Sequence, residues 1–255
     1  MKSERIIGIV GGMGPEAGID LARLITEQTL AECDQEHIPQ VLFSLTGQIN
    51  DRTEYLLKKS GPNPADTIAN ILMSMESVGA EIAGLACNTA HAPDIFNMVE
   101  HHLAENNSNI KLLNMVKEVA AFLKKEFPKV SKAGILGTNG TFITRQYNKL
   151  HEFNVETIYL PESKQNELHQ AIYDPRHGIK ANASKIPEQA RLTITRSLET
   201  LTEMGADAVF LACKELSFAH PSAHFKQIPV LNSSLILARA LINAHSPEKL
   251  KPLNS

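Results

Sequence analysis

Two cysteines stand at matched positions of the chain, and their residue type suits proton transfer at carbon. Cys87 and Cys213 each end a Leu-Ala-Cys tripeptide, and they lie 126 residues apart. A thiolate is a base and a thiol is an acid, so a facing pair can remove a proton from one side of a carbon and deliver one to the other. Two like charges in one site favour the mixed state, because the first ionisation raises the pKa of the second thiol. We therefore predict Cys87 and Cys213 as catalytic residues that invert a stereocentre, and we expect no cofactor.

The same offset of 126 residues aligns other parts of the chain. The aligned segments are 8–11 with 134–137, and 79–80 with 205–206. One register without a gap indicates a duplication that gives two similar halves. In a parallel sheet, functional groups gather at the carboxyl ends of the strands. We expect both cysteines at such ends, with the two thiols facing each other across an active-site cleft between the halves.

Short apolar runs alternate with helix-like segments along the whole chain. The runs 5–10, 40–45, 81–86 and 110–113 are expected strands, 65–78 and 116–127 are expected helices, and 47–64 is an expected long loop. Near-continuous apolar strands are typical of a mostly parallel sheet covered on both faces. We predict an α/β fold with two similar, pseudo-symmetric domains, each a mostly parallel sheet flanked by helices. Residues 1–114 plus 232–255 would form the first domain, and residues 115–231 the second.

Composition excludes several classes of partner. The 255 residues carry a net charge of −3, with 43% hydrophobic and 21% charged residues, which is typical of a soluble globular protein. We expect no nucleic-acid partner, because binders usually carry a basic face, and no membrane partner, because no run approaches about 18 apolar residues. Three scattered cysteines indicate free thiols and a cytoplasmic location. The ten histidines lack metal-ligand spacing, so we expect no metal. His91, beside the first cysteine tripeptide, either assists proton transfer or has a structural partner.

A glycine-rich turn follows the first apolar run. Gly12-x-Gly14-x-x-Ala17 fits a dinucleotide-binding fingerprint, but the segment 41–46 ends without the acidic residue that binds ribose. We interpret the turn as a close approach of the backbone to a small anionic ligand, with Met13 as a candidate site residue. Thr138 lies in the corresponding turn of the second half and is a candidate hydrogen-bond donor to that ligand.

Three segments resemble the aspartate/glutamate racemase family. They are 7–17 (IGIVGGMGPEA), 86–91 (ACNTAH) and 211–216 (LACKEL), in the family's order and spacing. The resemblance covers essentially the whole chain. It implies a cofactor-independent, aspartate racemase-like amino-acid racemase with two α/β domains. It also implies that Cys87 and Cys213 exchange acid and base roles with substrate handedness, and that the protein is a homodimer.

The resemblance also assigns substrate-binding residues. Arg52, in the segment Asn-Asp-Arg-Thr, and Lys180, in Gly-Ile-Lys-Ala, take the place of family residues that bind substrate carboxylates. Under the 126-residue offset the two fall in corresponding loops, one in each half, and together they would clamp a dicarboxylic amino acid. Asn88 and Thr89 offer polar groups beside the first thiol for the α-carboxylate. The predicted substrate is therefore L- or D-aspartate or glutamate.

One position departs from the family pattern. Lys214 directly follows Cys213, where the family usually has Thr. Lys214 either lowers the pKa of that thiol, binds a carboxylate, or points away from the site. This departure keeps two alternatives open: a related cysteine enzyme, such as a maleate-type isomerase, a hydantoin racemase or a decarboxylase, and a dicarboxylate-binding protein without turnover.

Overall fold

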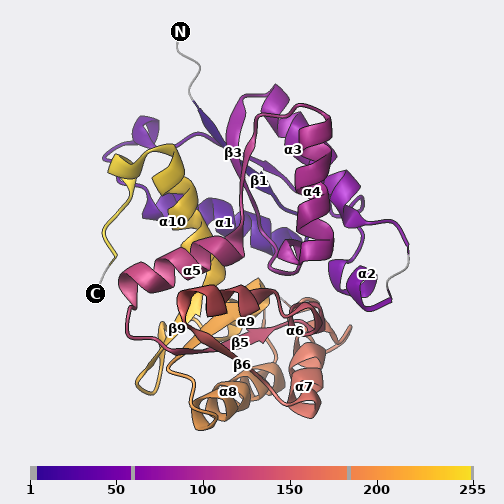
Figure 1. Cartoon of the computed structure of the whole chain (residues 1–255), viewed down its shortest axis with the longest axis vertical. Helices are drawn as coiled ribbons and strands as arrows, with labels where there is room; N and C mark the ends of the chain where they lie inside the picture. The colour runs from indigo at the N-terminus through magenta and orange to yellow at the C-terminus, as the bar shows by residue number, and fades with distance from the viewer. Residues whose placement is uncertain (1–4, 59–60, 183–184, 254–255) are drawn as a thin grey trace. The chain divides into compact units, whose positions relative to one another are not determined.

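The structure of the protein is a computed structural model that describes residues 5–58, 61–182 and 185–253. The chain forms two compact units, each built on one sheet (Figure 1). Unit 1 comprises Met1–Asp51, Ser60–Glu118 and Ser234–Ser255, and unit 2 comprises Arg52–Lys59 and Val119–Ser233.

The sheet of unit 1 is parallel throughout. Its strands, in spatial order, are β2 (Gln40–Phe43), β1 (Ile6–Val10), β3 (Ala80–Leu85) and β4 (Lys111–Leu113). Val10 pairs with Phe43 on one side and with Leu85 on the other. The three strands therefore end at one edge, and the residues that follow them are brought together there.

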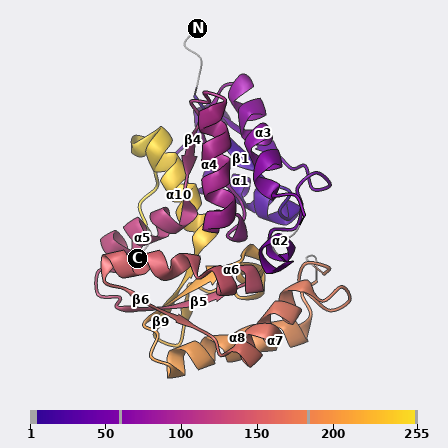
Figure 2. The same cartoon turned by 45° about the vertical axis from the view of Figure 1, so that its right-hand side comes forward.

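Helices cover both faces of this sheet. They are α1 (Pro15–Gln28), α3 (Pro64–Ser77), α4 (Pro93–Glu105) and α10 (Ser233–His245), joined by the short 3₁₀ turns η1 (Asp34–Glu36), η2 (Thr89–His91) and η4 (Pro247–Lys249). A Cβ at Gly8 would lie 3.0 Å from Met75 of α3, whereas one at Gly84 would lie 3.2 Å from Leu237 of α10. Gly8 pairs with Ala83, the neighbour of Gly84, so α3 and α10 lie on opposite faces. Figure 1 and Figure 2 both show α4 beside α3.

The sheet of unit 2 repeats the same strand order. Its strands are β6 (Glu156–Tyr159), β5 (Lys132–Gly137), β7 (Ala208–Ala212), β9 (Ile228–Asn232) and β8 (His224–Phe225). All the pairs are parallel except β8 with β9. The strands β5, β6, β7 and β9 correspond to β1, β2, β3 and β4 of unit 1, which confirms the predicted α/β fold with two similar, mostly parallel sheets.

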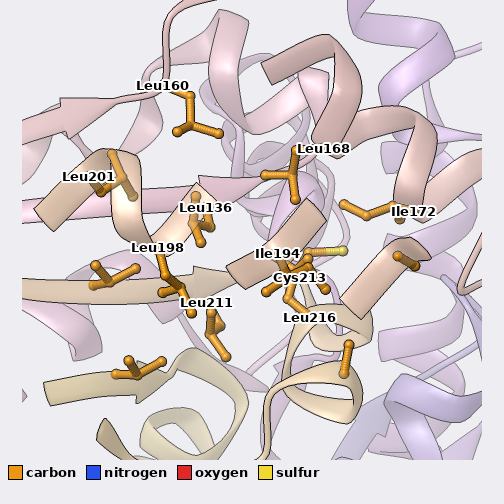
Figure 3. Packing of buried hydrophobic residues seen from close by; sticks show 14 of the residues in the cluster. Leu136, Leu160, Leu168, Ile172, Ile194, Leu198, Leu201, Leu211, Cys213 and Leu216 are labelled. Atoms are coloured by element: carbon orange, nitrogen blue, oxygen red, sulfur yellow. The ribbon is translucent and has the colours of Figure 1, made fainter. Parts of the chain in front are cut away.

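The core of unit 2 fills the space between the sheet and two long helices. The helices counted with this unit are α2 (Arg52–Lys58), α6 (Asn139–Thr144), α7 (Glu162–Tyr173), α8 (Glu188–Glu203) and α9 (Lys214–Ala219), with the 3₁₀ helix η3 (Gln146–Phe153). Leu198 and Leu201 of α8 and Leu168 of α7 pack on Leu136 and Leu211 of the sheet (Figure 3). On the opposite face, Tyr147 of η3 stacks on Phe210 of β7, with ring centroids 6.2 Å apart.

Two connections matter for the positions of the predicted site residues. Helix α5 (Met115–Glu126) carries the chain from unit 1 into unit 2, and α10 follows β9 but is counted with unit 1. The expectation of a long loop over 47–64 was wrong in part, because α2 forms within it. Helix α2 packs on α6 and is counted with unit 2, although its neighbours in sequence lie in unit 1.

Candidate active site

Cys213 lies at the carboxyl end of β7, against the apolar core of unit 2. It follows Ala212 directly and is the N-cap residue of α9. Its side chain belongs to the same buried cluster as Ile194 and Leu216, and Figure 3 shows it beside these two residues. Only 7% of the residue is exposed. The Cys213 Sγ donates a hydrogen bond of 2.9 Å to Oε2 of Glu215.

Glu215 joins this thiol to a cation that the sequence had assigned to substrate binding. Its other carboxylate oxygen, Oε1, accepts a hydrogen bond of 2.6 Å from Nζ of Lys180. Burial disfavours the charge of Glu215, but the adjacent Lys180 and the thiol hydrogen bond outweigh it, so the pKa of Glu215 is lowered. Burial likewise opposes the charge of Lys180, but the ion pair prevails and the pKa of Lys180 is raised. Both groups are therefore ionised at neutral pH.

A tight backbone turn holds Lys180 in place. The N–H of Lys180 donates to the carbonyl of Ile172 at 3.1 Å, and the N–H of Gly178 donates to the carbonyl of Asp174 at 2.8 Å. A Cβ at Gly178 would lie 2.5 Å from that carbonyl oxygen, so only glycine fits. Ile179 between them is fully buried in the core cluster. The Gly-Ile-Lys segment thus anchors the cation to the end of α7.

A row of hydroxyl groups connects the end of α7 to α2. The Tyr173 hydroxyl donates to Thr53 Oγ1 at 3.4 Å, and Thr53 Oγ1 donates to Thr138 Oγ1 at 3.4 Å. Thr138 is also the N-cap of α6, where its hydroxyl accepts the N–H of Thr141. In these contacts Thr138 acts as a cap and as an acceptor, and its role as a donor to a ligand stays a prediction.

Arg52 is the first residue of α2, next to Thr53, and 7% of it is exposed. The Nζ of Lys180 lies 5.2 Å from the centroid of the Tyr173 ring, whose hydroxyl bonds Thr53. Both predicted cations consequently belong to the unit that holds Cys213. The expectation of one cation in each half was wrong, because α2 packs with unit 2 rather than with the segments that flank it in sequence.

Cys87 lies at the corresponding strand end in unit 1. It comes two residues after β3, and the N–H of Ala86 bonds the carbonyl of Val10 at 3.0 Å, which ties this exit to β1. Cys87 is partly exposed, whereas Asn88 and Thr89 after it are buried at the start of η2. Cys87 thus leads into a 3₁₀ turn, while Cys213 directly precedes an α-helix.

His91 supports the backbone of this turn. Its Nδ1 lies 2.9 Å from the carbonyl oxygen of Cys87, and its ring stacks on Phe96 with centroids 5.1 Å apart. Burial lowers the pKa of His91 to about 4 despite its hydrogen bonds to backbone carbonyls. The imidazole is therefore neutral at pH 7, and because a carbonyl can only accept, Nδ1 carries the proton. This geometry favours the structural interpretation of His91.

The glycine-rich turn makes its close approach to the protein's own chain. Gly12 has φ +80°, and a Cβ there would lie 3.0 Å from the backbone nitrogens of Leu45 and Thr46. Met13 beside it is buried. The glycines therefore allow the turn after β1 to pack against the chain that leaves β2.

Lys214 is buried, and its Nζ lies 4.4 Å from the centroid of the Phe218 ring on the next turn of α9. The Phe218 ring thus gives the buried ammonium group of Lys214 a cation–π contact, at the position where the family usually has Thr.

Glu215 is the site residue that the sequence did not single out. It stands in the second cysteine motif, two residues after the thiol, but a carboxylate at a helix start is ordinary and carried no signal by itself. A partner for Lys180 could have been sought there, because a cation expected in a partly buried site needs a counter-charge.

Across residues 5–58, 61–182 and 185–253, no helix is both long enough and apolar enough to cross a membrane. Over the same residues, no three His, Cys, Asp or Glu side chains converge as a set of metal ligands.

The fold and the matched thiols define a class of protein: two similar α/β units, each with a cysteine at the carboxyl end of an inner strand. The chain belongs to the Asp/Glu/Hydantoin racemase family, which it matches over residues 10–241. This membership makes it an isomerase of the racemase type.

Individual relatives agree with this assignment. The broad specificity amino-acid racemase RacX of Bacillus subtilis (strain 168) is 24% identical over 256 residues, covering 94% of this chain and 98% of the relative. The aspartate racemase of Picrophilus torridus is 31% identical with a TM-score of 0.76, over 94% of each chain. The glutamate racemase of Francisella tularensis subsp. tularensis SCHU S4, solved with D-glutamate, has a TM-score of 0.69 at 14% identity, over 99% of this chain and 85% of that one. This last similarity concerns the fold alone.

Proposed function

We propose that the protein interconverts L- and D-aspartate, or L- and D-glutamate, without a cofactor, by proton transfer between the substrate α-carbon and two thiols. The observation that carries the proposal is the placement of Cys87 and Cys213 at the carboxyl ends of the equivalent strands β3 and β7. Packing alone does not require the same thiol at both places. The proposal includes a cytoplasmic homodimer, which the family resemblance implies.

In the proposed reaction, one cysteine acts as a thiolate and removes the α-proton, so that an S–H bond forms as the C–H bond breaks. The other cysteine, as a thiol, donates its proton to the opposite face of the resulting carbanion. The protonation states of the two cysteines are thereby exchanged, and the other enantiomer is the substrate for the reverse direction. Cations and hydrogen-bond donors at the substrate carboxylate stabilise the negative charge that develops in the transition state.

The surroundings of Cys213 support a substrate with two carboxylates. Arg52 and Lys180 are in the same unit as this thiol, and Arg offers a planar pair of donors suited to one carboxylate. The Lys180 ammonium has three donors, so its bond to Glu215 leaves others for a second carboxylate. Asn88 and Thr89, beside Cys87, would bind the α-carboxylate. The 31% identity to an aspartate racemase favours aspartate as the first substrate to test.

The test is proton NMR in D₂O with the reduced protein and no added cofactor, using L-aspartate, D-aspartate, L-glutamate and D-glutamate separately. We expect the α-proton signal to disappear while chiral chromatography detects the opposite enantiomer. Protein that is folded, carries titratable thiols and exchanges none of the four would contradict the proposal.

Single cysteine variants test the two-thiol mechanism. Cys87→Ser and Cys213→Ser should each lower the racemisation rate by about 10²–10⁴-fold, because each removes one acid–base group. Cys33→Ser is the matched control, since Cys33 is an exposed free thiol in the polar segment after α1. Near-full racemisation by either variant would rule out a reaction that needs both thiols.

Lys214 is the observation that favours two alternatives to this function. A lysine directly after Cys213, with its Nζ over Phe218, brings a further cation to α9. A related cysteine isomerase or decarboxylase would fit this added charge, as would a protein that binds a dicarboxylate without turnover. Turnover of maleate or of a hydantoin, or binding of aspartate without α-proton exchange, would favour these alternatives.

A further inference from the structure

We propose that Glu215 holds the proton of Cys213, and so makes this cysteine the acid of the resting cysteine pair. The inference rests on the proposed two-thiol function and assigns a role to a residue that acts through Cys213 rather than on the substrate. It concerns a contact wholly within unit 2.

The direction of the hydrogen bond favours a protonated Cys213. The Cys213 Sγ lies 2.9 Å from Oε2 of Glu215, and an ionised carboxylate can only accept, so the sulfur must be the donor. A thiolate has no proton to give, and would place a negative charge against another one. Both effects favour the protonated form of Cys213. The apolar neighbours in the core cluster add to this, because they solvate a thiolate poorly.

Lys180 keeps the Glu215 carboxylate charged. Its Nζ bonds Oε1 of Glu215 at 2.6 Å, whereas the thiol bonds the other oxygen, Oε2. Other ionisable groups near this set are Tyr173, whose ring lies under Lys180, and Lys214, whose Nζ lies over Phe218. The two lysines favour a thiolate from a distance, but Glu215 is the group in hydrogen-bond contact with the sulfur. We therefore expect the negative charge of Glu215 to outweigh the two lysines and to favour the protonated thiol of Cys213.

The consequence for the reaction is an unequal pair of cysteines. With Cys213 held as the thiol, the thiolate of the resting enzyme is on Cys87. The resting enzyme can then remove the α-proton of the enantiomer whose α-proton faces Cys87, because the thiolate is already on that cysteine. The opposite enantiomer needs the other protonation state, so it should show a lower kcat and a lower KM. The ratio kcat/KM must stay equal in both directions, because a racemisation has an equilibrium constant of one.

The test follows alkylation of each cysteine by iodoacetamide as a function of pH, with peptide mass spectrometry and no substrate present. In the wild-type protein we expect the midpoint of the Cys213 profile to lie above about 8.5, the ordinary pKa of a thiol. Glu215→Gln should lower this midpoint by about one unit or more, which raises the thiolate fraction at pH 7 about tenfold. A residue that merely positions the thiol would not move the midpoint, and one that acted as its base would raise it.

Three comparisons make the result decisive. Glu167→Gln, an exposed glutamate of α7, should leave the Cys213 profile unchanged, and Cys33 reports reagent activity in every sample. Glu215→Asp keeps the charge and should keep the midpoint close to the wild-type value. A wild-type midpoint below about 8.5 would overturn the inference even if Glu215→Gln did not fold.

The outcome is separable from that of the proposed function, because the alkylation experiment needs no turnover. Wild-type protein that racemises none of the four amino acids would overturn the function. Active protein in which Glu215→Gln leaves the Cys213 midpoint unchanged would overturn only the role of Glu215.

Discussion

The carboxylate of Glu215 bridges Cys213 and Lys180, with one oxygen 2.9 Å from the thiol sulfur and the other 2.6 Å from the ammonium nitrogen. The predicted catalytic thiol and the predicted substrate cation of unit 2 are thus coupled through one side chain. A change at either end alters the charge that the other end meets, so the three residues are expected to respond as a set.

Lys180→Met should destabilise the protein by about 1–3 kcal/mol, because it leaves the Glu215 carboxylate, only 14% exposed, without its counter-charge. The double variant Lys180→Met/Glu215→Gln should recover part of this loss, since it also removes the unpaired charge. Urea denaturation of the four proteins of this cycle measures the coupling. Additive effects of the two substitutions would show that the pair contributes nothing to stability.

Gly178→Ala should destabilise unit 2 by about 1–3 kcal/mol, because the new Cβ would lie 2.5 Å from the carbonyl oxygen of Asp174. It should also raise KM for dicarboxylic amino acids, because Lys180 sits two residues further along the displaced backbone. Gly47→Ala is the matched control, as a Cβ at Gly47 meets no atom within 4 Å. Thermal unfolding and initial rates check both effects, and equal melting temperatures for the two variants would contradict the steric argument.

The parallel sheets and the strand-end cysteines could be predicted because their determinants are local. Apolar runs mark buried strands, and the 126-residue offset places Cys87 and Cys213 at equivalent positions whatever the helices do. The sequence could not predict that α2 belongs to unit 2, because this depends on the packing of α2 against α6. The offset pointed to one cation per half, whereas Arg52 and Lys180 belong to the same unit.

The partner of Lys180 was hidden for a similar reason. Lys180 and Glu215 are 35 residues apart, and no periodicity links a loop after α7 to the first turn of α9. The immediate neighbour of the glycine-rich turn could not be predicted either, because a positive φ at Gly12 signals a close approach without saying to what. In the structure, the approach is to Leu45 and Thr46.

Tyr173→Phe should weaken substrate binding and lower the stability by no more than about 1 kcal/mol. The variant removes the hydroxyl that bonds Thr53 at 3.4 Å, next to Arg52, and keeps the ring under Lys180. If the displaced Arg52 loses about 1 kcal/mol of binding energy to the substrate carboxylate, KM rises about fivefold. Tyr55→Phe, in the same helix α2, is the control. Steady-state kinetics with aspartate distinguish the two, and a change in kcat alone would argue against a role in placing Arg52.

His91→Asn should flatten the dependence of stability on pH between about 4 and 6.5. Burial holds the pKa of His91 at about 4, below its ordinary value of 6.5, so in this range the unfolded chain binds a proton that the folded protein does not. Stability therefore rises with pH through this range, and the difference amounts to about 3 kcal/mol when integrated over the shift. Below pH 4 both states bind the proton, so the contribution of about 3 kcal/mol that is present at pH 7 has been lost and His91 adds no further slope.

The variant is chosen because an Asn amide nitrogen can replace Nδ1 as the donor to the Cys87 carbonyl, without an ionisable ring. It will lose the stacking on Phe96 at every pH, so the informative quantity is the slope rather than the absolute stability. Urea denaturation at pH 4.5 and pH 7 gives this slope, with His101→Asn, an exposed histidine of α4, as the control. An unchanged slope in His91→Asn would mean that the imidazole ionises in the folded protein, and the interpretation of His91 as a neutral support for the Cys87 turn would then be wrong.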